Sequence, residues 1–286
     1  MKIETIASGT CILRDTASRK GRTRAVAPAT TASRHLHYGR IILDAKDTPA
    51  TFGTGGFETV LICLGGTATV VCSGGTASLG AERQTFVLGK YDSLYVPRLA
   101  EVTVAPGPLG CDVAEIAAPV TKIHPVQFVP FADVQRDPGL HFTAGGPSAQ
   151  RDLNVLVGKN VEAGRIMAGV TFSQPGNWTS WPPHEHAAML EEAYLYVDMP
   201  KPAFGVQLVY TNSREPELAT IVHEGDIVLM PQGYHPNVAA PGGSINFVWM
   251  MAANIEDEDR QYGMVNVHPD FAAVGSGLDQ GRSARP

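Results

Sequence analysis

The sequence has little charge and no long apolar run. Only 17% of its 286 residues are charged, which is too few for a coiled coil or a long helical bundle. No stretch reaches the roughly 18 apolar residues that span a bilayer, so we expect no membrane partner. The first residues lack the apolar centre of a secretion signal, which favours a cytoplasmic protein. Disorder of the whole chain is also excluded, because 44% of the residues are hydrophobic and the net charge is only -6.

Cysteine is scarce and forms no paired motif. The four cysteines are widely spaced, without a C-x-x-C pair; they are Cys11, Cys63, Cys72 and Cys111. Cys63 and Cys72 fall in apolar runs, where buried thiols are common. We therefore expect reduced, structural cysteines rather than disulfides or redox chemistry.

Positive charge is concentrated at the beginning of the chain. Residues 1–40 hold eight basic residues and only two acidic ones. The cluster at 19–24 is of the kind found in nucleic-acid-binding arms, but no aromatic residues lie between its charges and no binding module follows. We expect a solvated segment here and no nucleic-acid partner.

Glycine and proline are plentiful, with 30 and 21 residues, and they separate short β-rich runs at 38–120 and 163–254. This pattern predicts an all-β fold of the sandwich or barrel type. Each half has a Glu that opens an apolar strand and a later strand that ends in Pro; the pattern aligns Glu58 with Glu192. Such similarity indicates a duplicated domain.

The expected organisation follows from these runs. It comprises a basic segment (1–34), an N-terminal domain (35–125), a linker (126–150), a C-terminal domain (151–271) and a flexible tail (272–286).

Two histidines two residues apart, His184 and His186, indicate metal binding. Residues i and i+2 of an extended strand face the same side, so both imidazoles can reach one ion. Glu191 and Glu192 follow closely, and a later β-rich stretch ends in Pro-Gln-Gly-Tyr-His235. Imidazole and carboxylate are suitable ligands for several divalent ions. We predict a site for one divalent cation, with Zn or Mn expected first and Fe or Ni as alternatives.

These segments resemble the two motifs of the cupin family, H-x-H-x(4,5)-E and G-x5-P-x-G-x(1,2)-H. The matching residues are His184, His186 and Glu192 for the first motif, and Gly225, Pro231, Gly233 and His235 for the second. The resemblance implies a jelly-roll β-barrel with the metal inside it. Together with the repeated strand order it implies a bicupin, two cupin domains in tandem. The ligands that it implies are His184, His186, Glu192 and His235.

The choice between Glu191 and Glu192 depends on strand parity. Glu192 shares a face with Tyr194 and Tyr196, whereas Glu191 lies on the face of Ala193. The face outside the barrel takes the small and apolar residues, and cupins of this kind carry E-x-Y-x-Y on this strand. Glu192 is therefore the predicted ligand, and Glu191 is the alternative.

The second half is similar, more narrowly, to a family of uronate isomerases. Residues 176–186 and 225–236 resemble the 5-deoxy-glucuronate isomerase of inositol breakdown. The short gap from His186 to Glu192 and the segment 194–199 resemble the 5-keto-4-deoxyuronate isomerase of pectin breakdown. The resemblance implies an aldose–ketose isomerase that converts 5-deoxy-D-glucuronate to 5-dehydro-2-deoxy-D-gluconate, with the pectin-pathway substrate as the alternative.

This reaction moves a proton between adjacent carbons through an enediolate, whose charge a divalent ion stabilises. A base must carry the proton, and the sequence identifies none. Tyr194 and Gln207 are expected to line the cavity and contact the substrate, a small-molecule sugar acid. Arg165 is the predicted anchor for the substrate carboxylate, because it begins a strand that enters the second barrel and cations are scarce nearby.

The first half has no H-x-H before Glu58, so no metal is predicted there and a structural or interface role is expected. His35-x-His37 is a competing pair, but it lies beside the basic segment. Cupins often associate through strand addition at sheet edges, so we expect a homo-oligomer. Two other function classes stay open: a metal-free sugar-acid-binding cupin and an iron-dependent cupin dioxygenase.

Overall fold

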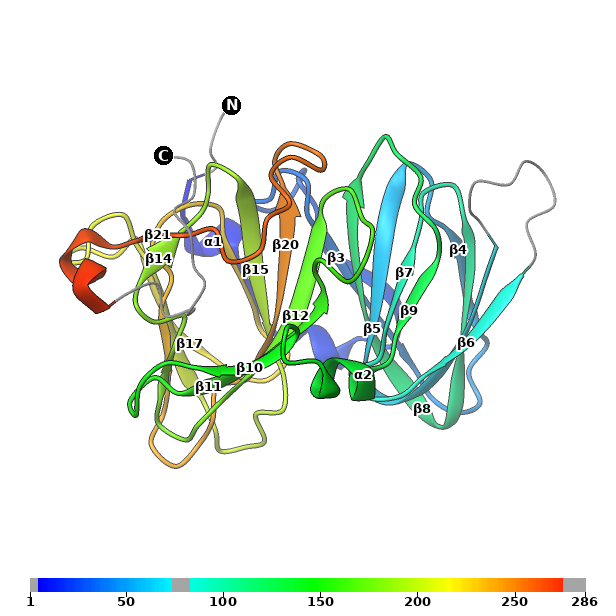
Figure 1. Cartoon of the computed structure of the whole chain (residues 1–286). Coiled ribbons are helices and arrows are strands. Elements are labelled where there is room, and N and C mark those ends of the chain that lie inside the picture. The colour runs from blue at the N-terminus through cyan, green and yellow to red at the C-terminus, as the bar shows by residue number, and fades with distance from the viewer. Residues whose placement is uncertain (1–4, 74–82, 275–286) are drawn as a thin grey trace.

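The short strands form two β-barrels that lie side by side (Figure 1). The computed structural model describes residues 5–73 and 83–274. Helices are short: α1 (Ser8–Cys11), α2 (Phe131–Arg136), and the 3-10 helices η1 (Thr16–Ser18) and η2 (Pro269–Val274). Within the described ranges, no helix is long and apolar enough to cross a membrane. The predicted flexible tail falls outside the described residues, except for 272–274 at the end of η2.

The first barrel is an eight-stranded sheet. Its strands are β2 (Gly21–Val26), β3 (His37–Leu43), β4 (Ala50–Gly53), β5 (Phe57–Ser73), β6 (Gln84–Leu88), β7 (Ser93–Val96), β8 (Glu101–Pro119) and β9 (Gln127–Val129). The order is β2-β3-β8-β5-β7-β9, with β4 on β8 and β6 on β5. The long strands β5 and β8 pair along almost their whole length and lie at the centre of this sheet.

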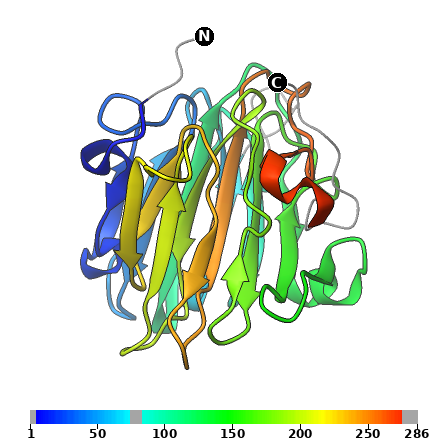
Figure 2. The ribbon, with the colours of Figure 1, turned by 90° about the vertical axis from the view of Figure 1, so that its left-hand side faces the viewer.

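The second barrel has a seven-stranded sheet, β1-β18-β15-β20-β12-β11-β10, a four-stranded sheet, β13-β19-β16-β17, and the pair β14-β21 (Figure 2). The strands are β1 (Ile12–Leu13), β10 (His141–Ala144), β11 (Arg151–Val157), β12 (Ile166–Ser173), β13 (Trp178–Thr179), β14 (His184–Glu185), β15 (Leu190–Tyr196), β16 (Gly205–Val209), β17 (Leu218–Val222), β18 (Ile227–Met230), β19 (Asn237–Ala239), β20 (Phe247–Ala253) and β21 (Asn266–Val267).

Alternation along β5 shows how the barrels share a core. Leu61 and Cys63 point into the first barrel, where they pack in a cluster confined to that half. Val60 and Ile62, on the opposite face, join a larger cluster that includes Leu195 of the second barrel. Burying each such side chain contributes roughly 1.5–3 kcal/mol. The two barrels are therefore held together by an apolar layer.

The basic N-terminal segment is folded onto both barrels, which differs from the expected solvated segment. Strand β1 pairs with β18 of the second barrel, and β2 pairs with β3 of the first. Arg14 lies 2.6 Å from Asp226 of the second barrel. Arg22 and Arg24 both donate to the buried Glu115 of the first barrel. The clustered charges thus pair with carboxylates of the protein itself.

The stretch expected as a linker, 126–150, also contains regular structure. Strand β9 pairs with β7 of the first barrel, and β10 pairs with β11 of the second. The crossing from one barrel to the other therefore falls between β9 and β10, at α2.

Two buried carboxylates connect the barrels reciprocally. Glu58 of β5 accepts the backbone N–H groups of residues 164–166 at 2.7 to 2.8 Å. Glu191 of β15 accepts those of residues 34–36 at 2.5 to 2.6 Å. Residues 164–166 lead into β12 as residues 34–36 lead into β3. Each barrel thus supplies a carboxylate that binds the backbone at the start of a strand in the other barrel.

Strand register shows which residues correspond in the two barrels. Glu58 lies opposite Ala118 on β8, and Glu191 lies opposite Ala252 on β20. The alignment of Glu58 with Glu192 in the sequence was therefore wrong by one residue. The position that matches Glu192 in the first barrel is Thr59, since Thr59 lies opposite Val96 as Glu192 lies opposite Met230.

Candidate metal centre

Four polar side chains converge inside the second barrel from three places in the chain. His184 is on the short strand β14, and His186 follows it directly. Glu192 is on β15, on the barrel face shared with Tyr194 and opposite the face of Glu191. His235 follows the turn at the end of β18. All four ligand candidates are buried.

Three of these residues form a close cluster. Ligand atoms of His186, Glu192 and His235 all lie within 4.8 Å of one another. The Nε2 atoms of His186 and His235 each lie 3.1 Å from Oε2 of Glu192. His184 is adjacent, with its ring centroid 5.1 Å from that of His235. The structure thus brings together the four residues predicted as ligands.

Backbone carbonyls orient the three imidazoles. Nδ1 of His184 lies 2.8 Å from the Pro182 oxygen, Nδ1 of His186 lies 3.2 Å from the Leu190 oxygen, and Nδ1 of His235 lies 2.9 Å from the Gly233 oxygen. A carbonyl only accepts, so each Nδ1 must carry the proton. Nε2 of His186 and His235 then faces Glu192. Metal-bound histidines in proteins are usually held by a hydrogen bond of this kind from the other ring nitrogen.

The electrostatics of the cluster suit a cation. Burial raises the pKa of Glu192, but the adjoining imidazoles of His186 and His235 lower it to about 2. Burial, with the neighbouring imidazoles, lowers the pKa of His184 to about 3. Nε2 of His235 is buried and has no hydrogen-bond partner, because its short distance to Glu192 lacks hydrogen-bond geometry. Three imidazoles, an ionised carboxylate and an unsatisfied ring nitrogen match the donor set of a divalent ion.

Glu191 lies on the opposite face of β15 from Glu192 and binds the backbone of residues 34–36. Its carboxylate accepts the three N–H groups of residues 34–36, and Nε of Arg34 lies 3.7 Å away. Burial raises its pKa, which these hydrogen bonds oppose. The structure therefore places Glu192, not Glu191, with the imidazoles.

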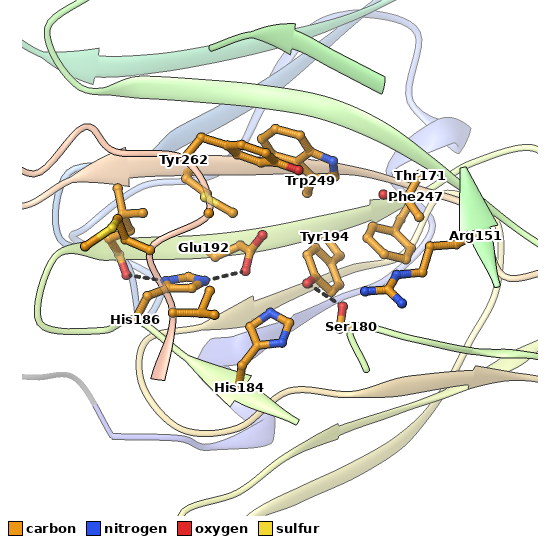
Figure 3. A pocket seen from close by; sticks show the side chains of 15 residues that line it. Arg151, Thr171, Ser180, His184, His186, Glu192, Tyr194, Phe247, Trp249 and Tyr262 are labelled. Atoms are coloured by element: carbon orange, nitrogen blue, oxygen red, sulfur yellow. Dashed lines mark hydrogen bonds and ion pairs between the residues drawn. The ribbon is translucent and has the colours of Figure 1, made fainter. Parts of the chain in front are cut away.

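A small cavity of about 60 Å³ opens onto the cluster. Figure 3 shows His186 and Glu192 on one side of it and Arg151 on the other, with Ser180 and Tyr194 between them. Ser180 and Tyr194 are joined by a hydrogen bond of 2.7 Å between their hydroxyl oxygens. The remaining wall is largely aromatic and apolar, including Trp249, Phe247 and the segment 262–265.

Two donors in the cavity wall are left without partners. Nε1 of Trp249 and the phenol oxygen of Tyr262 are buried and form no hydrogen bond. Their rings stack with centroids 5.4 Å apart. An unsatisfied buried donor costs about 1–3 kcal/mol, so such groups commonly mark a ligand site.

The residues predicted to bind substrate fall into two groups. Tyr194 lines the cavity. Gln207 does not: its side-chain amide donates to the His235 carbonyl at 2.9 Å and accepts from the Tyr196 hydroxyl at 2.6 Å. Gln207 therefore positions the chain at His235.

The prediction of Arg165 as the carboxylate anchor needs correction. Its guanidinium donates to the carbonyls of Pro119, Ala253 and Asn254, and it does not line the cavity. The position of Arg165 at the start of a strand did not predict where its side chain points. The side chain points toward the first barrel, where it contacts Pro119. The arginine in the cavity is Arg151, the first residue of β11.

Sequence reasoning missed Arg151, Ser180, Trp249 and Tyr262. They come from four separate segments and share no motif or spacing. Ser180 has one physical mark, a left-handed backbone with φ 50°, which a sequence does not reveal.

Comparison with known proteins gives one matching family and several relatives. Residues 12–271 match the KduI/IolB family. A 5-deoxy-glucuronate isomerase of Geobacillus kaustophilus is 30% identical over 206 residues, which cover 69% of this chain and 72% of the relative. A protein of the same name from Shouchella clausii is 29% identical, over 68% of this chain and 72% of the relative.

Solved structures confirm the architecture. An IolB-like protein of Salmonella typhimurium superposes with a TM-score of 0.75 at 21% identity, covering 93% of this chain and 97% of that one. An oxalate decarboxylase of Lactobacillus farciminis superposes with a TM-score of 0.61 at 10% identity, covering 95% and 92%. At these identities the likeness concerns the fold alone. The predicted all-β fold of two cupin domains in tandem is confirmed.

Proposed function

The chain belongs to the KduI/IolB family and is an isomerase, and from that premise we propose that it converts 5-deoxy-D-glucuronate to 5-dehydro-2-deoxy-D-gluconate with the help of a bound divalent cation. One observation carries the proposal: the buried cluster of His184, His186, Glu192 and His235 opens onto a cavity in a chain whose relatives are named 5-deoxy-glucuronate isomerases.

The donor set determines the kind of ion. Imidazole and carboxylate together favour Zn or Mn over ions that prefer sulfur ligands. A divalent cation held by these four residues supplies Lewis-acid stabilisation of the negative charge that develops on the substrate oxygens. The hydrogen bonds from the three Nδ1 atoms to backbone carbonyls fix the orientation of the imidazole rings that would bind the ion.

The reaction itself is a proton transfer with no net change in atoms. The proton on C2 of the aldehyde form leaves, an enediolate forms, and a proton returns to C1, while the hydroxyl proton passes from O2 to O1 to give the ketone. Tyr194 stays protonated at neutral pH because burial raises its pKa well above the ordinary value. Because one of the two hydroxyl hydrogens is used in the bond between Tyr194 and Ser180, the pair can donate one hydrogen bond to a substrate oxygen, while the apolar wall excludes water.

The experiment measures metal content and isomerase activity on the same purified protein. We expect about one divalent ion per chain, conversion of 5-deoxy-D-glucuronate, and loss of both after treatment with a chelator. Conversion of 5-keto-4-deoxyuronate instead would assign the alternative substrate, which the six-residue step from His186 to Glu192 favours. Oxygen consumption would indicate a dioxygenase. A protein that binds sugar acids with no metal and no turnover would be a binding module.

A further inference from the structure

Arg151 is a buried cation in the wall of the candidate metal cavity. It is only 2% exposed, and it lines the cavity together with His186 and Glu192. One guanidinium nitrogen donates to the Ala149 carbonyl at 3.1 Å. Burial lowers its pKa, while the nearby Tyr194 and Tyr262 raise it. A buried guanidinium in a cavity wall can offer a bound anion a charged hydrogen-bond donor.

The cavity has two chemically different sides. The side at His186 and Glu192 offers lone pairs and negative charge, which attract a cation. The side at Arg151 offers positive charge and N–H groups (Figure 3). The wall also holds the two unsatisfied donors, the indole N–H of Trp249 and the phenol of Tyr262. A ligand that satisfies both sides must carry an anionic group away from the atoms that meet the metal.

We propose that Arg151 binds the carboxylate of the substrate, and that Trp249 and Tyr262 donate hydrogen bonds to oxygens of the bound sugar acid. The inference rests on the proposed function, because a uronate carries its carboxylate at the opposite end from the aldehyde. With the aldehyde end at the His and Glu cluster, the carboxylate meets Arg151. A guanidinium binds a carboxylate through two parallel hydrogen bonds, which gives both affinity and orientation.

Substrate entry requires movement of one wall. The cavity of about 60 Å³ is far smaller than the roughly 300–1,000 Å³ of most small-molecule sites. The segment 262–265 is followed by β21, which pairs with β14 through two residue pairs. Gly263 within it has φ 79° and open space around its Cβ position. We expect this segment to move outward when a sugar acid binds.

The test measures binding of D-glucuronate and of D-glucose to the metal-loaded protein by calorimetry. The two probes differ in the carboxylate, so their affinity ratio reports the anchor without requiring turnover. We expect wild type to prefer the acid by at least about tenfold, and Arg151→Met to reduce the ratio to about one, since the charge and the N–H donors that recognise the carboxylate are lost. Metal content should remain unchanged. Arg151→Lys keeps the charge but not the paired geometry and should give an intermediate ratio.

The matched control is Arg260→Met. Arg260 is a half-buried arginine of this barrel that donates to the carbonyls of Ile166 and Gly158 and does not line the cavity. It should keep the wild-type ratio. If Arg151→Met fails to fold, Trp249→Phe is used, with an expected loss of sugar-acid affinity of roughly fivefold.

Two results would overturn the inference: a wild type without preference for the acid, or an Arg151→Met protein that keeps it. Equal loss of affinity for both probes would also do so, because it would indicate general damage to the cavity. The proposed function is judged separately. A wild type that prefers the acid but isomerises no uronate would reject the isomerase assignment and retain Arg151 as a carboxylate anchor.

Discussion

The two barrels share a scaffold and differ in the few positions that can bind a metal. In both, a buried carboxylate on the central strand, Glu58 or Glu191, accepts three backbone N–H groups of the other half. At the next position the first barrel has Thr59 and the second has Glu192. The carboxylates common to both barrels connect the halves, whereas among the described residues the proposed metal ligands lie in the second barrel.

The largest effect is expected from replacing Glu192, the carboxylate proposed to bind the metal in the second barrel. Glu192→Gln should reduce metal content severely and lower isomerase activity on the order of 10³-fold, since the ion and the charge that holds it are both lost. The matched change in the first barrel, Thr59→Val, should leave both unchanged. Metal analysis and turnover on 5-deoxy-D-glucuronate measure the two effects. A Glu192→Gln protein with full metal content would contradict the assignment.

The shared carboxylates should matter for stability in both barrels. Glu58→Ala and Glu191→Ala each leave three buried or part-buried N–H groups without this acceptor, at an expected cost of about 3 kcal/mol in the free energy of unfolding. Urea denaturation measures this. We expect similar losses for the two variants, and a fall in metal affinity only for Glu191→Ala, because Glu192 is its neighbour. If Glu58→Ala leaves the free energy of unfolding unchanged, the hydrogen bonds of Glu58 to the second barrel do not contribute to stability.

A smaller effect should follow from changing Gln207, which acts on the site through the backbone. Its amide donates to the His235 carbonyl, so Gln207→Leu should weaken metal affinity by roughly tenfold. The exposed Gln84→Leu in the first barrel is the control. A metal titration with a competing chelator distinguishes the two. Unchanged affinity in Gln207→Leu would mean that His235 is held by the chain without this hydrogen bond.

The smallest effect concerns the surface charges of the basic segment. Arg14 pairs with Asp226 of the second barrel, and its side chain is 47% exposed. Arg14→Ala should therefore lower stability by about 1 kcal/mol at low salt and less at high salt. The fully solvated pair of Lys20 and Asp44 should give almost no change when Lys20 is replaced by Ala. Thermal unfolding at two salt concentrations tests both.

What the sequence predicted, and what it did not, follows from how local each signal is. The H-x-H pair and the parity of Glu192 are properties of single strands, and the glycine and proline turns mark the strands themselves. Arg151 and Tyr262 line one cavity only because the barrel brings together β11 and the segment after β20. The basic segment looked solvated because its partner Glu115 is far away in the sequence.

The pairing of β1 with β18 also has a consequence for how the chain is made. Arg14 and Asp226 are 212 positions apart, so at about 5–20 residues per second the ribosome needs roughly 10–40 s between them. During that time β1 has been synthesised but its pairing partner β18 has not. The second barrel thus contains a strand that precedes the first barrel in the chain, so a cut between the two barrels would separate β1 from its partner β18.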